Sequence, residues 1–247
     1  FVESKFKLGN TMGIAPMAAL TSGDGRNSFG EDSRDSDIGG VKIGGRLDFY
    51  PLGFFKDGNE LTNVDLERED TFKFVVGVAG SQNNGASGAA GESHGDFFLF
   101  DENGTNSLPD YSQLYTDVLM KYKGFSFLAE YANTSAEGID KVFIDDAATQ
   151  ILAPQQISEF LALGDSYNFQ LGYITKNGYS FDVRYGTATA EFENYLGSVL
   201  SDMNETTLGL SKYFYKNALK VQASYTRIEP SMGETIHQIE LILHITL

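Results

Sequence analysis

Residues 169–186 read FQLGYITKNGYSFDVRYG, and every second position is apolar on both sides of the dipeptide Asn177–Gly178. These positions are Phe169, Leu171 and Tyr173 before the dipeptide and Phe181, Val183 and Tyr185 after it. A period of two is typical of a β-strand with one apolar face, and Asn-Gly between two such runs is the strongest short-range signal for a hairpin. The stretch therefore predicts an antiparallel hairpin. Its second face, with Gln170, Asp182 and Arg184, meets either bulk solvent or a water-filled cavity.

The same alternation recurs along the whole chain and predicts an all-β fold. It appears at 3–12, 40–50, 70–80, 113–123, 124–133, 167–175, 179–187, 205–215, 218–228 and 237–247. Each segment is close to the roughly 9–11 residues that a tilted strand needs to cross a bilayer. We therefore expect residues 1–247 to form a single domain, an antiparallel transmembrane β-barrel with at least ten strands.

The connections between these segments alternate in length. Tight turns are expected at Lys123–Gly124, Asn177–Gly178 and Lys216–Asn217. Long polar connections are expected at about 13–37, 81–111, 134–166, 188–204 and 229–236. The connection 51–69 is the exception, because it is long but falls on the side of the tight turns. Short turns at one rim and long loops at the other are typical of outer-membrane barrels, in which the long loops are extracellular.

Composition excludes several classes of protein. The formal charge of −16 argues against nucleic acid as a partner, because phosphate backbones are bound by clustered Lys and Arg. The absence of Cys excludes disulfides and thiolate metal sites. No apolar window is long enough for a membrane-spanning helix, and the chain starts at Phe1 without a recognisable leader, so that we expect either a removed leader or a missing N-terminal part.

The face opposite the apolar one carries more bases than acids, although the chain as a whole is acidic. The bases that we expect to line a pore and to face anions are Lys42, Arg46, Lys73, Lys121, Arg184 and Lys220. A soluble β-sandwich would also alternate, but its outer face should share the acidic sign of the surface. The pattern therefore favours a barrel with a basic, water-filled lumen and acidic loops.

Several stretches resemble the phosphate-selective porin O and P family in its Bacteroidetes-type form. They are TFKFVVGVAG, LYTDVLMKYKGFSFLAEYA, YNFQLGYITKNGYSFDVRYG, TTLGLSKYFYKNALKVQASYTRIE and the closing QIELILHITL. The resemblance covers roughly residues 38–135 and 166–247, which are similar to the C-terminal part of the family's sequences. It implies a barrel of about 16 strands in the outer membrane of a Gram-negative bacterium, surrounded by lipid and lipopolysaccharide, which conducts small anions as a homotrimer or with outer-membrane partners. Its phosphate-binding arginine clusters find no counterpart here.

Other chemistry has weaker signals. The three histidines, His94, His237 and His244, are isolated, so that polar surface residues explain them better than the Ser-His pair of an outer-membrane phospholipase. The acidic stretches 23–37 and 101–106 are either Ca²⁺ loops or solvated loops, and neither follows the twelve-residue calcium pattern. Residues 145–165 predict a short helix, which either folds into the pore or packs on the rim.

The sequence therefore predicts a passive channel for small hydrophilic solutes, anions such as phosphate included, without a catalysed reaction or a required cofactor. The alternative is a non-conducting outer-membrane barrel that anchors surface loops or a partner. Strand number separates the two, because a ten-stranded barrel leaves little free lumen. If these strands form the whole barrel, 3–12 must pair with 237–247; we expect instead that further strands complete it.

Overall fold

The computed structural model of the chain describes residues 1–21, 42–56, 58–89, 97–192, 195, 197–216 and 218–246. The described part is a 12-stranded antiparallel sheet with two short 3₁₀ helices. The strands are β1 (Val2–Glu3), β2 (Phe6–Leu8), β3 (Met12–Thr21), β4 (Lys42–Tyr50), β5 (Lys73–Asn84), β6 (Asp110–Tyr122), β7 (Phe125–Glu137), β8 (Gly164–Ile174), β9 (Tyr179–Ala190), β10 (Met203–Tyr215), β11 (Leu219–Pro230) and β12 (Ile236–Ile245). The 3₁₀ helices are η1 (Asn59–Leu61) and η2 (Pro154–Glu159).

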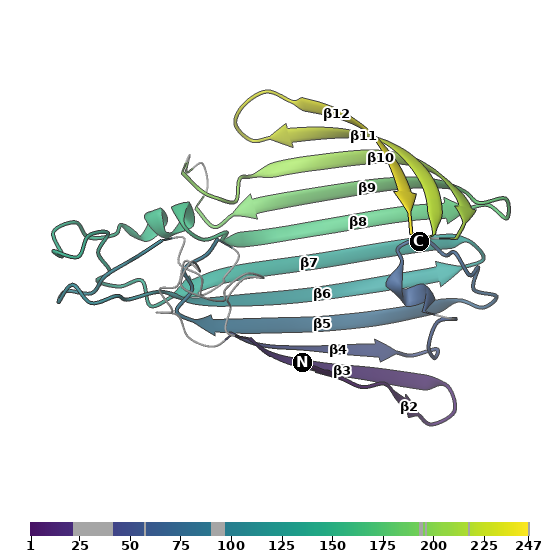
Figure 1. Ribbon diagram of the computed structural model, residues 1–247, viewed down its shortest axis with the longest axis horizontal. Helices are drawn as coiled ribbons and strands as arrows, with labels where there is room; N and C mark the ends of the chain where they lie inside the picture. The colour runs from purple at the N-terminus through teal and green to yellow at the C-terminus, as the bar shows by residue number, and fades with distance from the viewer. Residues whose placement is uncertain are drawn as a thin grey trace.

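The sheet is a meander that curves without closing. From β3 to β12 each strand pairs with the next strand along the chain, while β1 and β2 both pair with β3. Figure 1 shows the long strands side by side, with β11 and β12 bending over at one side of the sheet and β2 and β3 at the other. Among the described residues, β12 pairs only with β11, so that the pairing of 3–12 with 237–247 is not formed. The architecture is all-β, antiparallel and barrel-like, with an open sheet.

The first expected strand was misplaced. A single strand over 3–12 was predicted, whereas the chain forms two short strands there and then a long one, β3, inside the expected loop 13–37. Pro16 and the small residues of β3 hide its alternation, because Pro lacks a ladder donor and Gly and Ala mark no face. The remainder of that loop, 22–41, lies outside the described residues. The other expected segments overlap β4 to β12.

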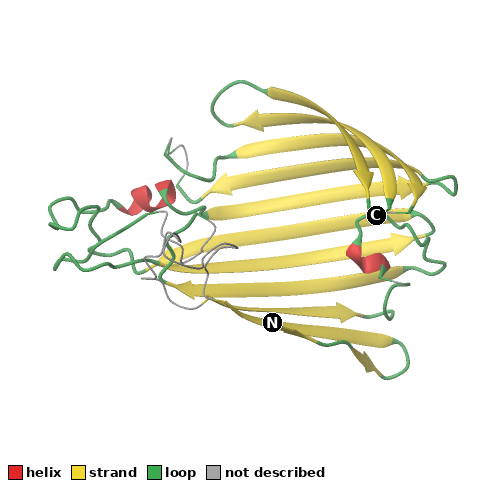
Figure 2. Cartoon of the chain, viewed as in Figure 1, coloured by secondary structure: helices red, strands yellow, loops and turns green. Residues whose placement is uncertain are grey.

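The two ends of the sheet differ, as the connection lengths predicted. One end carries the tight turns after β6 and β8, together with the connection from β4 to β5. The other end carries the long connections after β5, β7 and β9, and η2 lies among them (Figure 2). These connections share an apolar cluster with the start of β6, which includes Leu99, Tyr111, Val142, Ile157 and Leu161. The short helix predicted within 145–165 is therefore the 3₁₀ helix η2, which packs with the loops at this end.

The register separates the sheet into an apolar and a polar face. Apolar residues stand opposite one another from strand to strand. One such row is Phe49, Val76 and Val118, and another is Phe127, Leu171, Val183, Leu208, Tyr225 and Ile239. Many of them are exposed: Leu171 is 52% accessible and Leu208 is 55% accessible. No helix among the described residues is long and apolar enough to span a membrane.

Candidate functional site

The polar face of the sheet, called the inner face below, carries all six bases predicted to line a pore. The register of paired residues from β4 to β11 assigns every second residue of each strand to the same face. The bases on this face are Lys42, Arg46, Lys73, Lys121, Arg184 and Lys220. The face is concave. Lys5, before β2, and Lys216, after β10, both reach the same segment that lies over it. The register thus brings the predicted residues onto one curved wall.

Arg46 is paired with two carboxylates on this wall. Its guanidinium donates two hydrogen bonds to Asp117, at 2.6 and 2.9 Å, and contacts Asp48 Oδ1 at 2.7 Å. To reach Asp117 on β6, Arg46 crosses β5 at Gly77, where a Cβ would collide with its guanidinium. A planar guanidinium fits a carboxylate in this two-bond geometry. Arg46 is therefore a brace across three strands, and its charge is compensated.

Residues 51–56 and 58–72, the inner segment, connect β4 to β5 and fold over the inner face. Their apolar contacts place Phe54 and Phe55 against Tyr50, Val75 and Leu119. Phe54 lies directly over Gly13 of β3, where a Cβ would overlap the ring. Only glycine at this position leaves room for the phenyl ring on the strand. The inner segment thus has an apolar anchor on β3 to β6.

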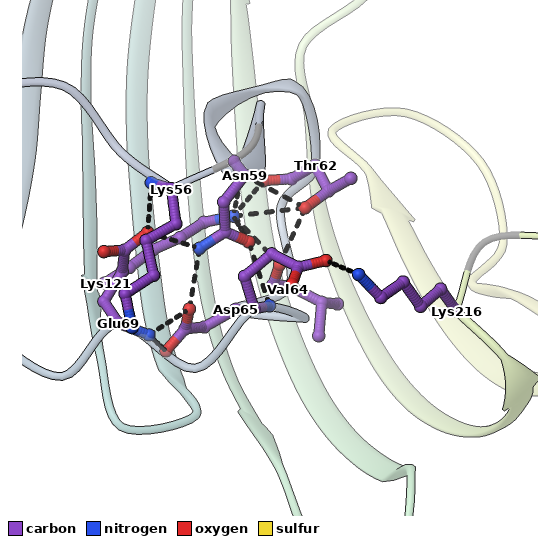
Figure 3. A network of polar contacts seen from close by, with 9 residues as sticks. Lys56, Asn59, Thr62, Val64, Asp65, Glu69, Lys121 and Lys216 are labelled. Atoms are coloured by element: carbon purple, nitrogen blue, oxygen red, sulfur yellow. Dashed lines mark hydrogen bonds and ion pairs between the residues drawn. The ribbon is translucent and has the colours of Figure 1, made fainter.

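Lys121 on β6 binds the inner segment from the side that faces the sheet (Figure 3). Its side chain is 1% accessible, and its ammonium donates to the carbonyl oxygens of Asn59, Thr62 and Val64, the last two at 2.6 and 2.9 Å. A buried ammonium is tolerated only where hydrogen-bond acceptors replace water, and these carbonyls do so. Lys121, one of the bases predicted to line a pore, lies on the inner face and is covered there by the inner segment.

A buried polar network completes this anchor. Asp65 and Glu69 are 0% and 1% accessible, and both accept hydrogen bonds from the side-chain amide of Asn59, at 2.8 and 3.0 Å. Asp65 also accepts from the backbone N–H of Gly124, in the tight turn between β6 and β7, at 2.7 Å. The guanidinium of Arg68 donates to the carbonyl oxygens of Ile174 and Lys123. The segment is thus tied to the ends of β6, β7 and β8.

Two ion pairs extend this attachment to the sides of the sheet. Lys5 contacts Glu60 at 2.8 Å, and Lys216 contacts Glu67 at 2.5 Å. The lysine of each pair is exposed, so that each pair adds little stability by itself. Their value is geometric, because they place one segment against residues from both sides of the curved sheet. Figure 3 shows Lys216 reaching the segment from one of these sides.

A polar groove of about 650 Å³ remains between the inner segment and strands β8 to β12. The segment contributes Leu61, Thr62, Asn63 and Val64 to the groove. The strands contribute mainly hydroxyl and amide side chains, together with a few ionisable ones: Gln170, Asp182, Arg184, Thr207, Ser211, Tyr213, Lys220, Gln222, Ser224, Thr226, Glu240 and His244. The groove is therefore hydrophilic with charges of both signs.

Sequence reasoning missed two features of this wall. Glu205 lies on the inner face and forms an ion pair with Arg184, which compensates the predicted base. The sequence could have placed Glu205 on this face, because residues two apart on a strand share a face and Thr207, two residues later, pairs with Arg184. The inner segment was noticed only as a connection too long for its rim. The three predicted bases Lys42, Lys73 and Lys220 form no ion pair with another described residue.

The other candidate sites are ordinary polar groups where they are described. Asp101, in the acidic stretch 101–106, accepts hydrogen bonds from the backbone N–H groups of Asn103 and Thr105, which lower the pKa of its carboxyl. The described residues contain no cluster of three or more metal-ligating side chains. His237 Nδ1 lies 2.7 Å from the hydroxyl of Tyr225, and His244 lines the groove. His94 and the stretch 23–37 lie outside the described residues.

Comparison of the chain with protein-family models, with curated proteins and with solved structures found no match.

Proposed function

We propose that the chain forms the wall of an outer-membrane β-barrel channel through which small hydrophilic solutes diffuse. One observation carries this proposal: long consecutive strands, most of 10 to 13 residues, put exposed apolar side chains on one face and polar side chains on the other. A solvated monomer rarely exposes so large an apolar surface. Strands of this length suffice to cross the hydrocarbon core, and the tight turns and long loops lie at opposite ends, as in known barrels.

Anions such as phosphate are the expected solutes. Lys42 and Lys220 support this preference, because they lie on the inner face and form no ion pair with another described residue. A base that keeps its charge in a narrow lumen lowers the electrostatic cost of an anion relative to a cation. Arg46 and Arg184 contribute less, since carboxylates compensate both.

A non-conducting scaffold is the second candidate, and the inner segment favours it. The segment covers the inner face of β4 to β7 and buries Lys121 there. A wall filled in this way could hold surface loops in place without passing solute. The groove beside β8 to β12 favours the channel instead.

Recording from planar bilayers separates the two functions. The purified full-length protein, folded in detergent with a β-rich circular dichroism spectrum, is added to a bilayer in KCl. Stepwise conductance is expected for the channel, and a reversal potential shifted toward the chloride potential is expected in a salt gradient. Folded protein that inserts without conducting would support the scaffold. Recovery of the native protein outside the outer-membrane fraction of its host would contradict both.

A further inference from the structure

The inner segment is the part of the chain that departs most from the plan of the sheet. The other described connections at its end are tight, as at Lys123–Gly124 and Lys176–Gly178, whereas this one folds back along the concave face. It contacts the regions before β2 and after β10 and lies over the strands between them. A connection with that reach lies across the lumen of any barrel to which this sheet contributes.

We propose that the inner segment is a fixed constriction, which closes the lumen over β4 to β7 and confines passage to the groove along β8 to β12. This inference rests on the proposed channel function and adds the route and the residues that select the solute. The main support is the position of the segment. Its residues 61–64 form one wall of the groove, and the opposite side of the segment is buried against the sheet.

The segment is fixed because its attachments are buried. Releasing it would break the hydrogen bonds that join it to the sheet: from the Lys121 ammonium to Val64, from the Gly124 N–H to Asp65, and from the Arg68 guanidinium to Ile174. It would also return the rings of Phe54 and Phe55 to water. These hydrogen bonds and ring contacts lie on one buried surface and are lost together when the segment moves, so that the docked position is preferred. The segment is a permanent part of the wall and not a mobile gate.

The groove selects by hydrogen bonding more than by net charge. Its strand wall is dominated by hydroxyl and amide groups, and Arg184 is compensated by Glu205. Such groups replace the hydration of a small polar solute, while Lys220 stands in the same lining as the acids Asp182 and Glu240. Asn63 is the critical position on the segment, because its amide donates to Gln170 Oε1 at 3.3 Å between the two walls of the groove. The groove therefore suits small polar solutes that both donate and accept hydrogen bonds, and inorganic phosphate serves as one probe of it.

Cysteine modification tests the route directly, since the chain has no native cysteine. Asn63→Cys in the full-length protein is treated with a trimethylammonium methanethiosulfonate, and incorporation is checked by mass spectrometry. We expect loss of most of the unit conductance in KCl and of phosphate current. Thr71→Cys is the matched control, because Thr71 belongs to the same segment, is exposed and does not line the groove. Its modification should leave the current unchanged.

The outcomes separate this inference from the proposed function. If the unmodified wild-type protein is folded but does not conduct, the channel function fails. If it conducts, and Asn63→Cys either resists modification or carries full current after it, the constriction is overturned and the channel function stands. Replacing residues 58–66 by a short Gly-Ser linker should increase the unit conductance, provided that the β-rich spectrum is kept. Unchanged conductance in that folded variant would also overturn the inference.

Discussion

Lys73 and Lys121 stand directly opposite each other on β5 and β6, and both ammonium groups bind backbone carbonyl oxygens of the inner segment. Directly opposed like charges destabilise a pair of strands. Here Lys73 binds the carbonyl of Leu52, whereas Lys121 binds those of Asn59, Thr62 and Val64. The two lysines thus turn an unfavourable pairing in the sheet into the attachment of the segment above it.

This arrangement predicts a large effect of Lys121→Met. Methionine preserves the apolar stem but removes a donor from three carbonyl oxygens: those of Asn59 and Val64 keep other donors, whereas that of Thr62 loses its ammonium partner. A buried acceptor left without a donor costs about 1–3 kcal/mol. We expect a fall of about 2 kcal/mol in the free energy of unfolding, measured by urea titration of protein folded in detergent. Lys176→Met removes the same charge from an exposed turn and should change stability little. Equal stabilities of the two variants would contradict the anchoring role of Lys121.

Gly77 should be intolerant of any side chain. Its Cβ would occupy the space through which Arg46 reaches Asp117, so that Gly77→Ala forces this pair apart. Gly80→Ala is the matched control on the same strand, because its Cβ would meet Gln113 O at an ordinary 3.4 Å. We expect Gly77→Ala to be the less stable variant by about 1–3 kcal/mol in the same titration. A smaller loss at Gly77 than at Gly80 would rule out the crossing of β5 by Arg46.

The proposed preference for anions predicts a shift of the reversal potential when the bases without an ion-pair partner are replaced by acids. Lys42→Glu combined with Lys220→Glu should move the reversal potential in a KCl gradient toward the potassium potential, because both side chains lie on the inner face. Lys212→Glu makes the same type of charge change on the apolar face and should leave the potential unchanged. A conducting double variant with the wild-type reversal potential would refute the anion preference.

Most of the sheet was predictable from the sequence, because apolar and polar residues alternate along the strands and thereby mark their two faces. Phe181 and Val183 alternate with Asp182 and Arg184, and the register keeps them on opposite faces. Strand β3 was not predicted, because its Gly, Ala and Pro residues show no alternation of large apolar and polar side chains. Nine-residue β4 and the later strands were found because their large apolar residues recur regularly.

The candidate site was less predictable, because the alternation of apolar and polar residues shows which face of the sheet a side chain lies on but not which residue it contacts. It placed Arg184 and Lys121 on the inner face, but their partners are Glu205 on the next strand and carbonyls of the inner segment. Those contacts depend on how a non-repetitive segment packs, for which the sequence offers no period. The excess of length at 51–69 was the one available signal, and Gly13, which leaves room for Phe54, is recognisable only in the fold.

The proposed topology predicts chemical labelling from outside the cell. The connection after β5 lies at the end of the long loops, so that Glu102→Cys should react with an impermeant maleimide on intact cells. Ser87, in the same connection, is a poor position because it is fully buried. Lys176→Cys, in the tight turn at the opposite end, should react only after lysis. The reverse pattern would invert the orientation of the barrel.

The loop after β7 should loosen in acid. Asp145 accepts hydrogen bonds from the backbone N–H and hydroxyl of Thr149 and from the backbone N–H of Gln150, which lower the pKa of its carboxyl below the usual value. A lowered pKa means that the charged form stabilises the folded loop above the usual carboxyl range, and that this contribution is lost as pH falls through the lowered value.

Hydrogen exchange measured by mass spectrometry, corrected for the intrinsic pH dependence of exchange, checks this expectation. Protection of the Thr149 and Gln150 amides should fall between neutral pH and about pH 3, which lies below the ordinary aspartate pKa. Asp145→Asn should show weakened protection already at neutral pH and little further change in acid, because an amide oxygen accepts these bonds without a charge. Asp146→Asn, the neighbouring control, should keep the wild-type profile. Protection of both amides that does not vary with pH in the wild type would show that the carboxylate of Asp145 does not hold this loop.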